Sequence, residues 1–270
     1  MTGVRPQGRA EIKKLLAKHG LRPQRHLGQH FLADPNIVER IVLEADIMPG
    51  DRVLEVGPGT GTLTVALAAA GASVVSYEVD RTLRALLNDV VADLDVLLRF
   101  EDAMALDWTS EFGDGDWKMV ANLPYNVGTP LLLDAVRGAA GISRFVVMVQ
   151  REVALRMAAK PGGKLYGVPS VVAQLYTRPR IAFRVPPTVF MPPPEVESAV
   201  VVLDRVESHP LAESAARLAA AAFQQRRKML RGSLSELIDR DSFMAAEVDP
   251  AARPEELTAA DFLRLAEAVE

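Results

Sequence analysis

Short apolar runs alternate with segments of helical periodicity through the first 150 residues. The apolar runs, which are typical of buried strands, cover 52–56, 73–77, 95–100, 118–121 and 144–149. The segments between them with a helical pattern cover 62–70, 81–92 and 131–136. Strands that alternate with helices predict an α/β fold with a doubly wound parallel sheet, in which ligands bind at the carboxyl ends of the strands.

The pattern changes after this region. Helical periodicity over 151–159 and 168–176 flanks a polar, glycine-containing stretch, Lys160–Gly167, which predicts a mobile loop. Two strand-like runs follow, 181–185 and 198–206, and the proline-rich connection between them favours an antiparallel pair at one edge of the sheet. The last sixty residues, 211–270, are helical in pattern, and Thr258 with Asp261 is close to a capping box.

The N-terminal region differs from both. A helix is predicted over 9–19 with Gly20 after its end, Arg22–His30 has the composition of a loop, and a further helix begins near Asp34-Pro35. The sequence therefore predicts three parts: a basic N-terminal segment over 1–30, the sheet domain over 31–206, and a small all-α C-terminal domain over 207–270.

Composition limits the class of protein. The 270 residues include no cysteine, which excludes disulfides and thiolate zinc sites and fits a reducing compartment. No apolar run approaches the ~18 residues of a membrane span, so a soluble, cytoplasmic and monomeric protein is expected. No cluster of metal-ligating residues stands out, and no metal is predicted.

Charge is distributed unevenly along a chain of net charge −4. Residues 1–30 carry seven basic residues against one acid, a net charge of +6, whereas 241–270 carry eight acids against two basic residues, a net charge of −6. Such asymmetry permits a local site for a polyanion on an acidic protein, although a solvated basic tail explains the N-terminal charge equally well.

Three glycines, Gly57, Gly59 and Gly61, follow the first strand and open a helix. Glycine allows a tight turn and lets a ligand lie against the backbone, where helix-end N–H groups face it. The Gly-x-Gly-x-Gly spacing resembles the S-adenosylmethionine site of Rossmann-like methyltransferases, but a nicotinamide or flavin site remains an alternative.

Acidic residues end the next two strands. Glu78 follows the second strand and can accept hydrogen bonds from both ribose hydroxyls of a nucleoside. Asp102 follows the third strand, where a carboxylate can accept from an adenine amino group. Either acid alone could be a solvated strand end. Together with the glycine loop they predict a nucleoside site along one rim of the sheet.

The fourth strand ends in Asn122-Leu123-Pro124-Tyr125, on the same rim. An exocyclic adenine amine is a poor nucleophile because its lone pair is delocalised into the ring. If the Asn122 side-chain oxygen and a backbone carbonyl near Leu123-Pro124 accept its two protons, the lone pair is directed towards a methyl donor. Pro124 stiffens the turn and Tyr125 can stack on the base. This run predicts methyl transfer to a base amine through positioning, without a strong base or metal.

The chain is identified here as a member of the ribosomal RNA adenine dimethyltransferase family, and most resembles its bacterial small-subunit branch. The resemblance spans about residues 22–265. It is carried by Gly28–Leu32, Glu55–Gly61, Glu78, Asp102-Ala103, Asn122–Tyr125, Gln150–Val153, Lys164–Gly167, Phe190–Ser198 and Phe223–Lys228. It implies N6,N6-dimethylation of two adjacent adenosines in the 3′-terminal hairpin loop of 16S rRNA during small-subunit maturation. S-adenosylmethionine is the implied donor and S-adenosylhomocysteine the product.

The resemblance also implies residue roles. The family's cofactor positions fall on His30, Leu32, Gly57, Glu78, Asp102 and Asn122, and Gly59 belongs to the same loop. Its base-holding positions fall on Asn122, Pro124 and Tyr125, with Phe190 as the ring expected on the opposite face of a flipped-out adenine. From the residues alone, Phe190 among prolines could equally be a core anchor.

One position departs from the family, which usually has asparagine where this chain has His30. An imidazole titrates near neutrality, so we expect cofactor affinity to vary with pH more than in an asparagine relative. A histidine that merely packs beside the site is the alternative.

Four cations, Arg226, Arg227, Lys228 and Arg231, lie within six residues at the start of the C-terminal domain. Such a group can neutralise several phosphates, so the sequence predicts rRNA binding there, with a solvated helix face as the alternative.

Other functions are compatible with the fold. A 23S rRNA adenine methylase would share the site, although the long C-terminal region favours the small-subunit enzyme. A non-catalytic ribosome-assembly factor could keep the fold, but the intact glycine loop, Glu78, Asp102 and Asn122 argue against lost turnover. A nicotinamide oxidoreductase leaves Asn122–Tyr125 unexplained.

Overall fold

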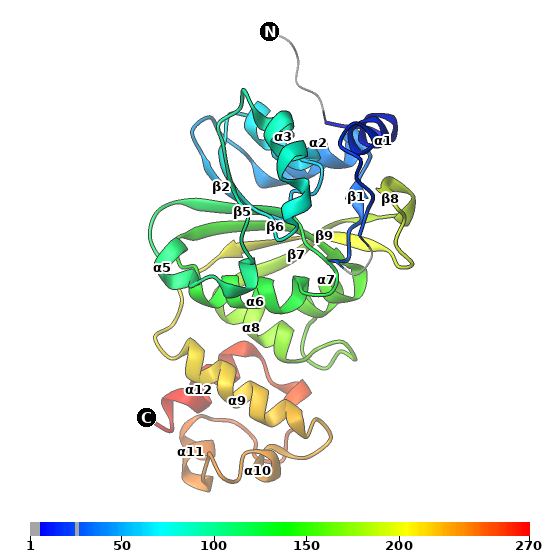
Figure 1. The fold of residues 1–270 in the computed structure, drawn as a ribbon. Helices are drawn as coiled ribbons and strands as arrows, with labels where there is room; N and C mark the ends of the chain where they lie inside the picture. The colour runs from blue at the N-terminus through cyan, green and yellow to red at the C-terminus, as the bar shows by residue number, and fades with distance from the viewer. Residues whose placement is uncertain (1–5, 25–26) are drawn as a thin grey trace. The chain divides into compact units, whose positions relative to one another are not determined.

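The computed structural model describes residues 6–24 and 27–270 (Figure 1). Its contacts divide the chain into two units. The first comprises Met1–Ala154 with Ile181–Leu203, and the second comprises Leu155–Arg180 with Asp204–Glu270. The predicted site residues from His30 to Asn122 all belong to the first unit, and the predicted RNA-binding cations all belong to the second.

A seven-stranded sheet organises the first unit, in the order β4-β3-β2-β5-β6-β9-β7. The strands are β2 (Arg52–Val56), β3 (Ser73–Tyr77), β4 (Val96–Arg99), β5 (Trp117–Asn122), β6 (Ile142–Gln150), β7 (Thr177–Val185) and β9 (Ser198–Arg205). The five strands from β4 to β6 pair in parallel. The predicted parallel sheet is confirmed, as is the pair of later strands, β9 and β7, at its edge.

The strand order reverses between β2 and β5. After β2 the chain adds β3 and β4 on one side, and it then returns to add β5 and β6 on the other. The carboxyl ends of β2 and β5 therefore adjoin at the point where such sheets bind their ligands. This topology brings the glycine loop, which follows β2, next to the Asn122 run that ends β5.

Helices cover both faces of this sheet. Those of the first unit are α1 (Arg9–Lys18), α2 (Pro35–Ala45), α3 (Thr62–Ala69), α4 (Arg84–Val91), α5 (Trp108–Phe112) and α6 (Gly128–Gly138), and α7 (Arg151–Met157) begins there. Figure 1 shows α2 and α3 on one face and α6 on the other. Helix α2 starts as predicted, because the Asp34 carboxylate accepts hydrogen bonds from two N–H groups of the first turn.

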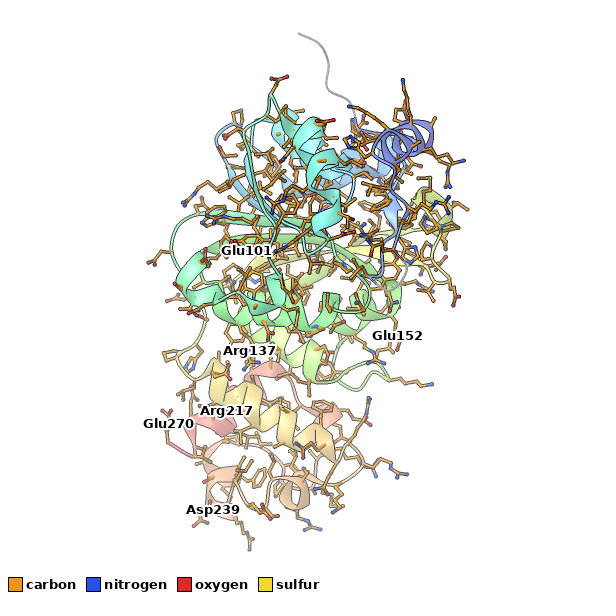
Figure 2. All side chains as sticks on the ribbon, viewed as in Figure 1. Glu101, Arg137, Glu152, Arg217, Asp239 and Glu270 are labelled. Atoms are coloured by element: carbon orange, nitrogen blue, oxygen red, sulfur yellow. The ribbon has the colours of Figure 1, made fainter. Side chains whose placement is uncertain are left out.

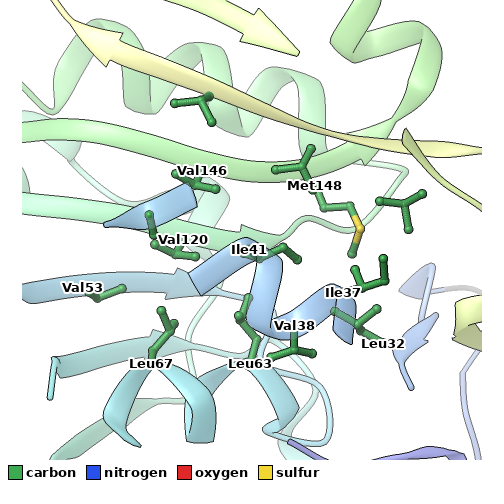
Figure 3. Close-up of a cluster of buried hydrophobic side chains, with 14 of the residues drawn as sticks. Leu32, Ile37, Val38, Ile41, Val53, Leu63, Leu67, Val120, Val146 and Met148 are labelled. Carbon is green, nitrogen blue, oxygen red and sulfur yellow. The ribbon is translucent and has the colours of Figure 1, made fainter. Parts of the chain in front are cut away.

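The core beneath the site lies between α2, α3 and the sheet (Figure 3). One face of α2, with Val38 and Ile41, packs with Leu63 and Leu67 of α3 and with strand residues such as Val120. All five side chains are at most 4% exposed. Burying a side chain of this size stabilises the fold by roughly 1.5–3 kcal/mol. The core thereby supports the ends of β2 and β5.

Helix α1 belongs to the same unit and is more than a basic tail. Its Ile12 and Leu16 are buried in a cluster with Phe31 and with Leu83 and Leu87. The cationic residues of the helix lie on its exposed side, so its positive charge and its packing occupy different faces.

Several short elements of the described residues were missed from sequence. Strands β1 (Phe31–Leu32) and β8 (Phe190–Met191) form a separate antiparallel pair, too short to show a periodic pattern. Helix α5 spans only five residues, too few to show a helical period. Strand β7 begins four residues before the predicted start, because an edge strand tolerates Pro179, which lacks an N–H donor.

The second unit is mainly helical, as predicted. Its helices are α8 (Val168–Tyr176), α9 (Ala212–Gln224), α10 (Leu230–Ser233), α11 (Arg240–Ala245) and α12 (Ala259–Glu267). Helices α8, α9 and α12 pack on one another, and the rings of Tyr166, Phe223 and Phe262 follow one another in contact. The capping box of Thr258 and Asp261 is confirmed by reciprocal hydrogen bonds. None of the helices described here is long and apolar enough to cross a membrane.

Candidate active site

A cleft opens at the carboxyl ends of β2 and β5. Residues from five segments line it: Leu27–Leu32, Glu55 with Gly57–Thr60, Thr62-Leu63, Glu78-Val79 and Asn122–Tyr125. The predicted residues His30, Leu32, Gly57, Gly59, Glu78, Asn122, Pro124 and Tyr125 are therefore brought together. Two predicted residues, Asp102 and Phe190, are not among those that line the cleft.

The glycine loop has the conformation and the surroundings that require glycine. Gly57 and Gly59 have φ angles of +74° and +58°, in the left-handed region that other residues rarely adopt. A Cβ on Gly59 would lie 2.8 Å from the Phe31 ring, and one on Gly57 would lie 3.5 Å from Pro124. The loop therefore lies against the Asn122 run at Gly57 and against Phe31 at Gly59, where a Cβ would collide with the ring.

Gln7 ties the N-terminal segment to the glycine loop. Its amide nitrogen donates to the Thr60 carbonyl at 3.0 Å, and its amide oxygen accepts from the Thr62 hydroxyl at 3.3 Å. One side chain, 53 residues away in sequence, thus fixes both the end of the loop and the start of α3. No pattern in the sequence singles out Gln7, because the contact depends on where α1 packs.

Glu78 is a buried acid in the lining of the cleft. Its carboxylate accepts hydrogen bonds from the Gly59 N–H at 3.2 Å and from the Asp80 N–H at 2.9 Å. Burial raises the pKa of Glu78 to about 7, although these two hydrogen bonds favour the ionised form. Each oxygen keeps acceptor capacity, so the side chain fits the ribose hydroxyls of a bound nucleoside.

Glu55 is a second buried carboxyl of the cleft. It is 1% exposed and accepts hydrogen bonds from the hydroxyls of Thr64 at 2.6 Å and Ser76 at 2.9 Å. Burial raises its pKa to about 7, and the neighbouring charge of Glu78 adds to the rise. The sequence interpretation placed Glu55 in a strand and assigned it no role. A glutamate within an otherwise apolar strand was the sequence feature that could have pointed to this buried carboxyl.

Asn122 presents an unsatisfied acceptor. Its Nδ2 group donates to the His30 carbonyl at 3.2 Å, which orients the amide. Its Oδ1 atom is buried and has no hydrogen-bond partner among the described residues. A buried acceptor without a donor costs about 1–3 kcal/mol, so the site favours a ligand that brings an N–H or O–H group.

A second acceptor lies beside it. The Pro124 carbonyl is already used, because it accepts from the Gly128 N–H at 2.8 Å and the Val127 N–H at 3.3 Å. The Leu123 carbonyl accepts no hydrogen bond within the part of the chain that the structure describes. Of the carbonyls of Leu123 and Pro124, that of Leu123 therefore keeps its acceptor capacity.

Tyr125 is held at two places. Its hydroxyl is hydrogen-bonded to the Ser198 hydroxyl, and its ring stacks on the His30 imidazole with ring centres 5.4 Å apart and planes 28° apart. Burial raises the pKa of Tyr125, so its hydroxyl stays protonated at neutral pH. His30 in turn places Nδ1 2.8 Å from the Pro192 carbonyl, an interaction in which Nδ1 donates. His30 thus packs against Tyr125 in the lining of the cleft, and its part in cofactor binding stays a prediction.

Phe190 lies in the core, and its predicted stacking on a base stays a prediction. The side chain is fully buried in the core cluster that includes Leu32, so its ring faces no ligand in this packing. The cause is the pairing of β8 with β1, which sets Phe190 opposite Leu32 and directs it into the core. A stacking role would require this side chain to leave the core.

Asp102 occupies a different setting from the other acids. It is exposed, and it caps the 3₁₀ turn η3 (Ala103–Ala105) by accepting from the Met104 N–H at 2.9 Å. Its predicted contact with an adenine amino group stays a prediction.

Comparison with known proteins identifies the family. The family model described as "Ribosomal RNA adenine dimethylase" matches residues 20–270. The chain belongs to this family. Among similar proteins, one from Magnetococcus marinus named "Ribosomal RNA small subunit methyltransferase A" is 42% identical over 94% of this chain and 95% of its own length. A protein of the same name from Phenylobacterium zucineum is 43% identical over 95% of this chain and 92% of its own length.

Solved structures support the fold of this family member. A dimethyladenosine transferase from Plasmodium falciparum superposes with a TM-score of 0.76 and 24% identity, covering 87% of this chain and 96% of that one. The 23S rRNA methyltransferase ErmE superposes with a TM-score of 0.70 and 24% identity, covering 88% of this chain and 99% of that one. The predicted Rossmann-like methyltransferase sheet with a helical C-terminal part is thus confirmed.

Proposed function

We propose that this chain transfers methyl groups from S-adenosylmethionine to N6 of two adjacent adenosines in the 3′-terminal hairpin loop of 16S rRNA. The product is N6,N6-dimethyladenosine, and the substrate is the small ribosomal subunit or its precursor. The enzyme acts as a monomer, in the cytoplasm, as part of small-subunit maturation. Membership of the adenine dimethylase family supports the reaction, and the relatives named for the small subunit support the substrate.

The observation that carries the proposal is the unpaired Oδ1 atom of Asn122. An exocyclic amine has two N–H groups, and we propose that Asn122 Oδ1 and the Leu123 carbonyl, which accept no hydrogen bond among the described residues, accept them. When both N–H groups are held in this way, the lone pair on N6 is directed out of the adenine plane. Catalysis is then positioning of a nucleophile, and it needs no ionised base.

Tyr125 supplies the platform for the base. A base stacked on a protein aromatic ring gains roughly 1–3 kcal/mol, and this offsets part of the cost of taking the adenine out of its loop. The contacts with Ser198 and His30 fix the ring in advance, so little conformational freedom is lost when the base arrives.

The cleft fits the donor. The glycine loop lines the cleft without side chains at Gly57 and Gly59, which admits contact of a ligand with its backbone, and Glu78 keeps acceptor capacity for ribose hydroxyls. We propose that His30, Leu32, Gly57, Gly59, Glu78, Asp102 and Asn122 hold S-adenosylmethionine. When bound, it supplies the methyl carbon and leaves as S-adenosylhomocysteine.

The test is to incubate the protein with methyl-labelled S-adenosylmethionine and unmethylated 30S particles, and in parallel with 23S rRNA, and to map the modified nucleotides. Dimethyladenosine at two adjacent positions near the 3′ end of 16S rRNA is expected, and Asn122→Ala should abolish most of it. Label confined to 23S rRNA, or no label with either substrate, would overturn the proposal.

A further inference from the structure

The segment Leu27–His30 lines the cleft and contacts the residues that end β5. A Cβ on Gly28, whose φ angle is +67°, would lie 3.6 Å from the backbone nitrogen of Tyr125. The His30 carbonyl accepts the hydrogen bond that orients the Asn122 amide. The position of this short segment therefore affects the geometry of both Tyr125 and Asn122.

Asp80 holds the segment from a position that does not line the cleft. Its Oδ2 atom accepts hydrogen bonds from the side-chain amides of Gln24 at 3.1 Å and Gln29 at 2.7 Å. Its Oδ1 atom accepts from the Thr82 N–H at 3.0 Å and from the hydroxyl of the same residue at 2.6 Å. Asp80 is 5% exposed, so this carboxylate is buried and receives hydrogen bonds on both oxygens.

The orientation of the Gln29 amide is fixed by the backbone. Its Oε1 atom accepts from the Gln24 N–H at 2.8 Å, so its Nε2 group must face Asp80. The Asp80 N–H in turn donates to the Glu78 carboxylate at 2.9 Å, and Glu78 also accepts from the Gly59 N–H. Directional hydrogen bonds thus join Asp80 to one wall of the cleft, to Glu78 and to the glycine loop.

These contacts require a hydrogen-bond acceptor on both sides of residue 80. An ionised carboxylate accepts on both oxygens, whereas an amide accepts on its oxygen and donates through its nitrogen. In either orientation, Asp80→Asn would turn an NH2 group towards an N–H donor, that of Thr82 or that of Gln29. A partly buried donor left without an acceptor favours displacement of the segment that carries it.

We infer that Asp80 is a positioning residue for methyl transfer, and that through Gln24 and Gln29 it holds Leu27–His30 in the geometry that binds S-adenosylmethionine. The inference rests on the proposed function for the role of Leu27–His30 in donor binding. Because the segment is already held in the free protein, little conformational freedom is lost when the donor arrives. A variant that keeps this geometry for about one-tenth of the time should bind the donor about ten-fold more weakly.

The first experiment measures the Kd for S-adenosylmethionine by calorimetry, without RNA. Asp80→Asn should raise this Kd by about ten-fold. Amide hydrogen exchange at Leu27 and Gln29, whose N–H groups donate to the Gln24 carbonyl at 3.2 Å and 3.4 Å, should accelerate. The matched control is Asp107→Asn, which removes the same charge from an exposed helix cap of the same unit and should change neither quantity. An unchanged Kd in Asp80→Asn, or an equal rise in the control, would overturn the inference.

The second experiment exchanges the two partners, which separates positioning from a general loss of stability. Gln29→Glu alone should weaken donor binding, because its carboxylate would face that of Asp80. Gln29→Glu combined with Asp80→Asn should restore most of the affinity at unchanged net charge, since the new carboxylate accepts from the new amide and from the Gln24 N–H. A double variant that binds no more tightly than either single variant would refute the positioning role.

Gln24→Met keeps the inference testable if Asp80→Asn fails to fold. The substitution removes one of the two amide donors to Asp80, at a position that does not line the cleft. It should raise the donor Kd by several-fold, because the segment is then held by Gln29 alone. Wild-type affinity in Gln24→Met would show that the attachment to Asp80 does not position the segment, and the inference would be wrong.

These measurements use the donor alone and do not depend on the rRNA substrate. Donor binding that responds to each variant as expected, in a wild-type protein that methylates no 16S rRNA, would refute the proposed function alone. Methylation of 16S rRNA by the wild-type protein, together with unchanged donor binding in Asp80→Asn, would refute this inference alone.

Discussion

Replacing Asn122 by aspartate tests whether the amide acts through two opposite faces. The wild-type side chain donates through Nδ2 to the His30 carbonyl and offers Oδ1 to the cleft. An ionised carboxylate keeps an acceptor but has no donor, so it places an oxygen against the His30 carbonyl oxygen about 3.2 Å away. A protonated carboxyl restores one donor and one acceptor, and it has nearly the shape of the amide.

The expected magnitude follows from the hydrogen bonds involved. Removing the acceptor in Asn122→Ala forfeits a bond to the reacting amine worth about 1–3 kcal/mol, which corresponds to a rate loss of roughly 5- to 150-fold. At pH 8 the methylation rate of Asn122→Asp should fall by at least the same factor, because the ionised carboxylate is also repelled by the His30 carbonyl oxygen. As the pH falls towards 5.5, the aspartate variant should recover activity, since burial favours the protonated carboxyl.

The assay is single-turnover methylation of unmethylated 30S particles, with each variant's rate divided by the wild-type rate at the same pH. The ratio of the two rates cancels any effect of the titration of Glu55 and Glu78, because variant and wild type both contain these residues. Asn122→Ala should show a ratio independent of pH, and cofactor affinity is measured separately for both variants. Wild-type activity in Asn122→Asp at pH 8, or a loss that stays constant from pH 5.5 to 8, would refute the two-faced role of the amide.

Three further predictions concern the surroundings of the cleft. Because burial raises the pKa of Glu55 from 4.5 to about 7, the neutral form is favoured in the folded state. Its contribution to stability is full below pH 4.5 and is lost as the pH rises through 7, by roughly 3 kcal/mol in all. Glu55→Gln should therefore melt at a higher temperature relative to wild type at pH 8 than at pH 5, and a pH-independent difference would contradict this. Gln7→Ala removes two hydrogen bonds, to the Thr60 carbonyl and from the Thr62 hydroxyl, each worth about 1 kcal/mol. Calorimetry should therefore show S-adenosylmethionine binding weakened by several-fold. Lys14→Ala, on the exposed side of α1, should leave this binding unchanged. His30→Asn removes the ring that stacks on Tyr125 and should raise the KM for 30S particles more than the Kd for the cofactor. A change confined to cofactor binding would contradict this.

Local sequence determined the sheet and most of the predicted residues that line the cleft. Closely spaced glycines after a strand predict a tight turn, because glycine permits positive φ angles. Gly57 and Gly59 adopt such angles. Apolar runs and helical periodicity report the burial of single elements, so strands β2 and β3 were predicted to the residue. Alternation of strands and helices then brought Glu78 and Asn122 to one rim, because the carboxyl ends of parallel strands share an edge.

Tertiary structure decided the partners of individual polar groups. Gln7 reaches the glycine loop across 53 residues, and Arg226 reaches Glu255 across 29, and neither contact has a signature in its own segment. A phenylalanine ring can stack on a base or pack in a core, and its identity does not distinguish the two. The pairing of β8 with β1 directs Phe190 into the core. Residue type sets which interactions a side chain can make, whereas only the packing of distant segments sets which of them it does make.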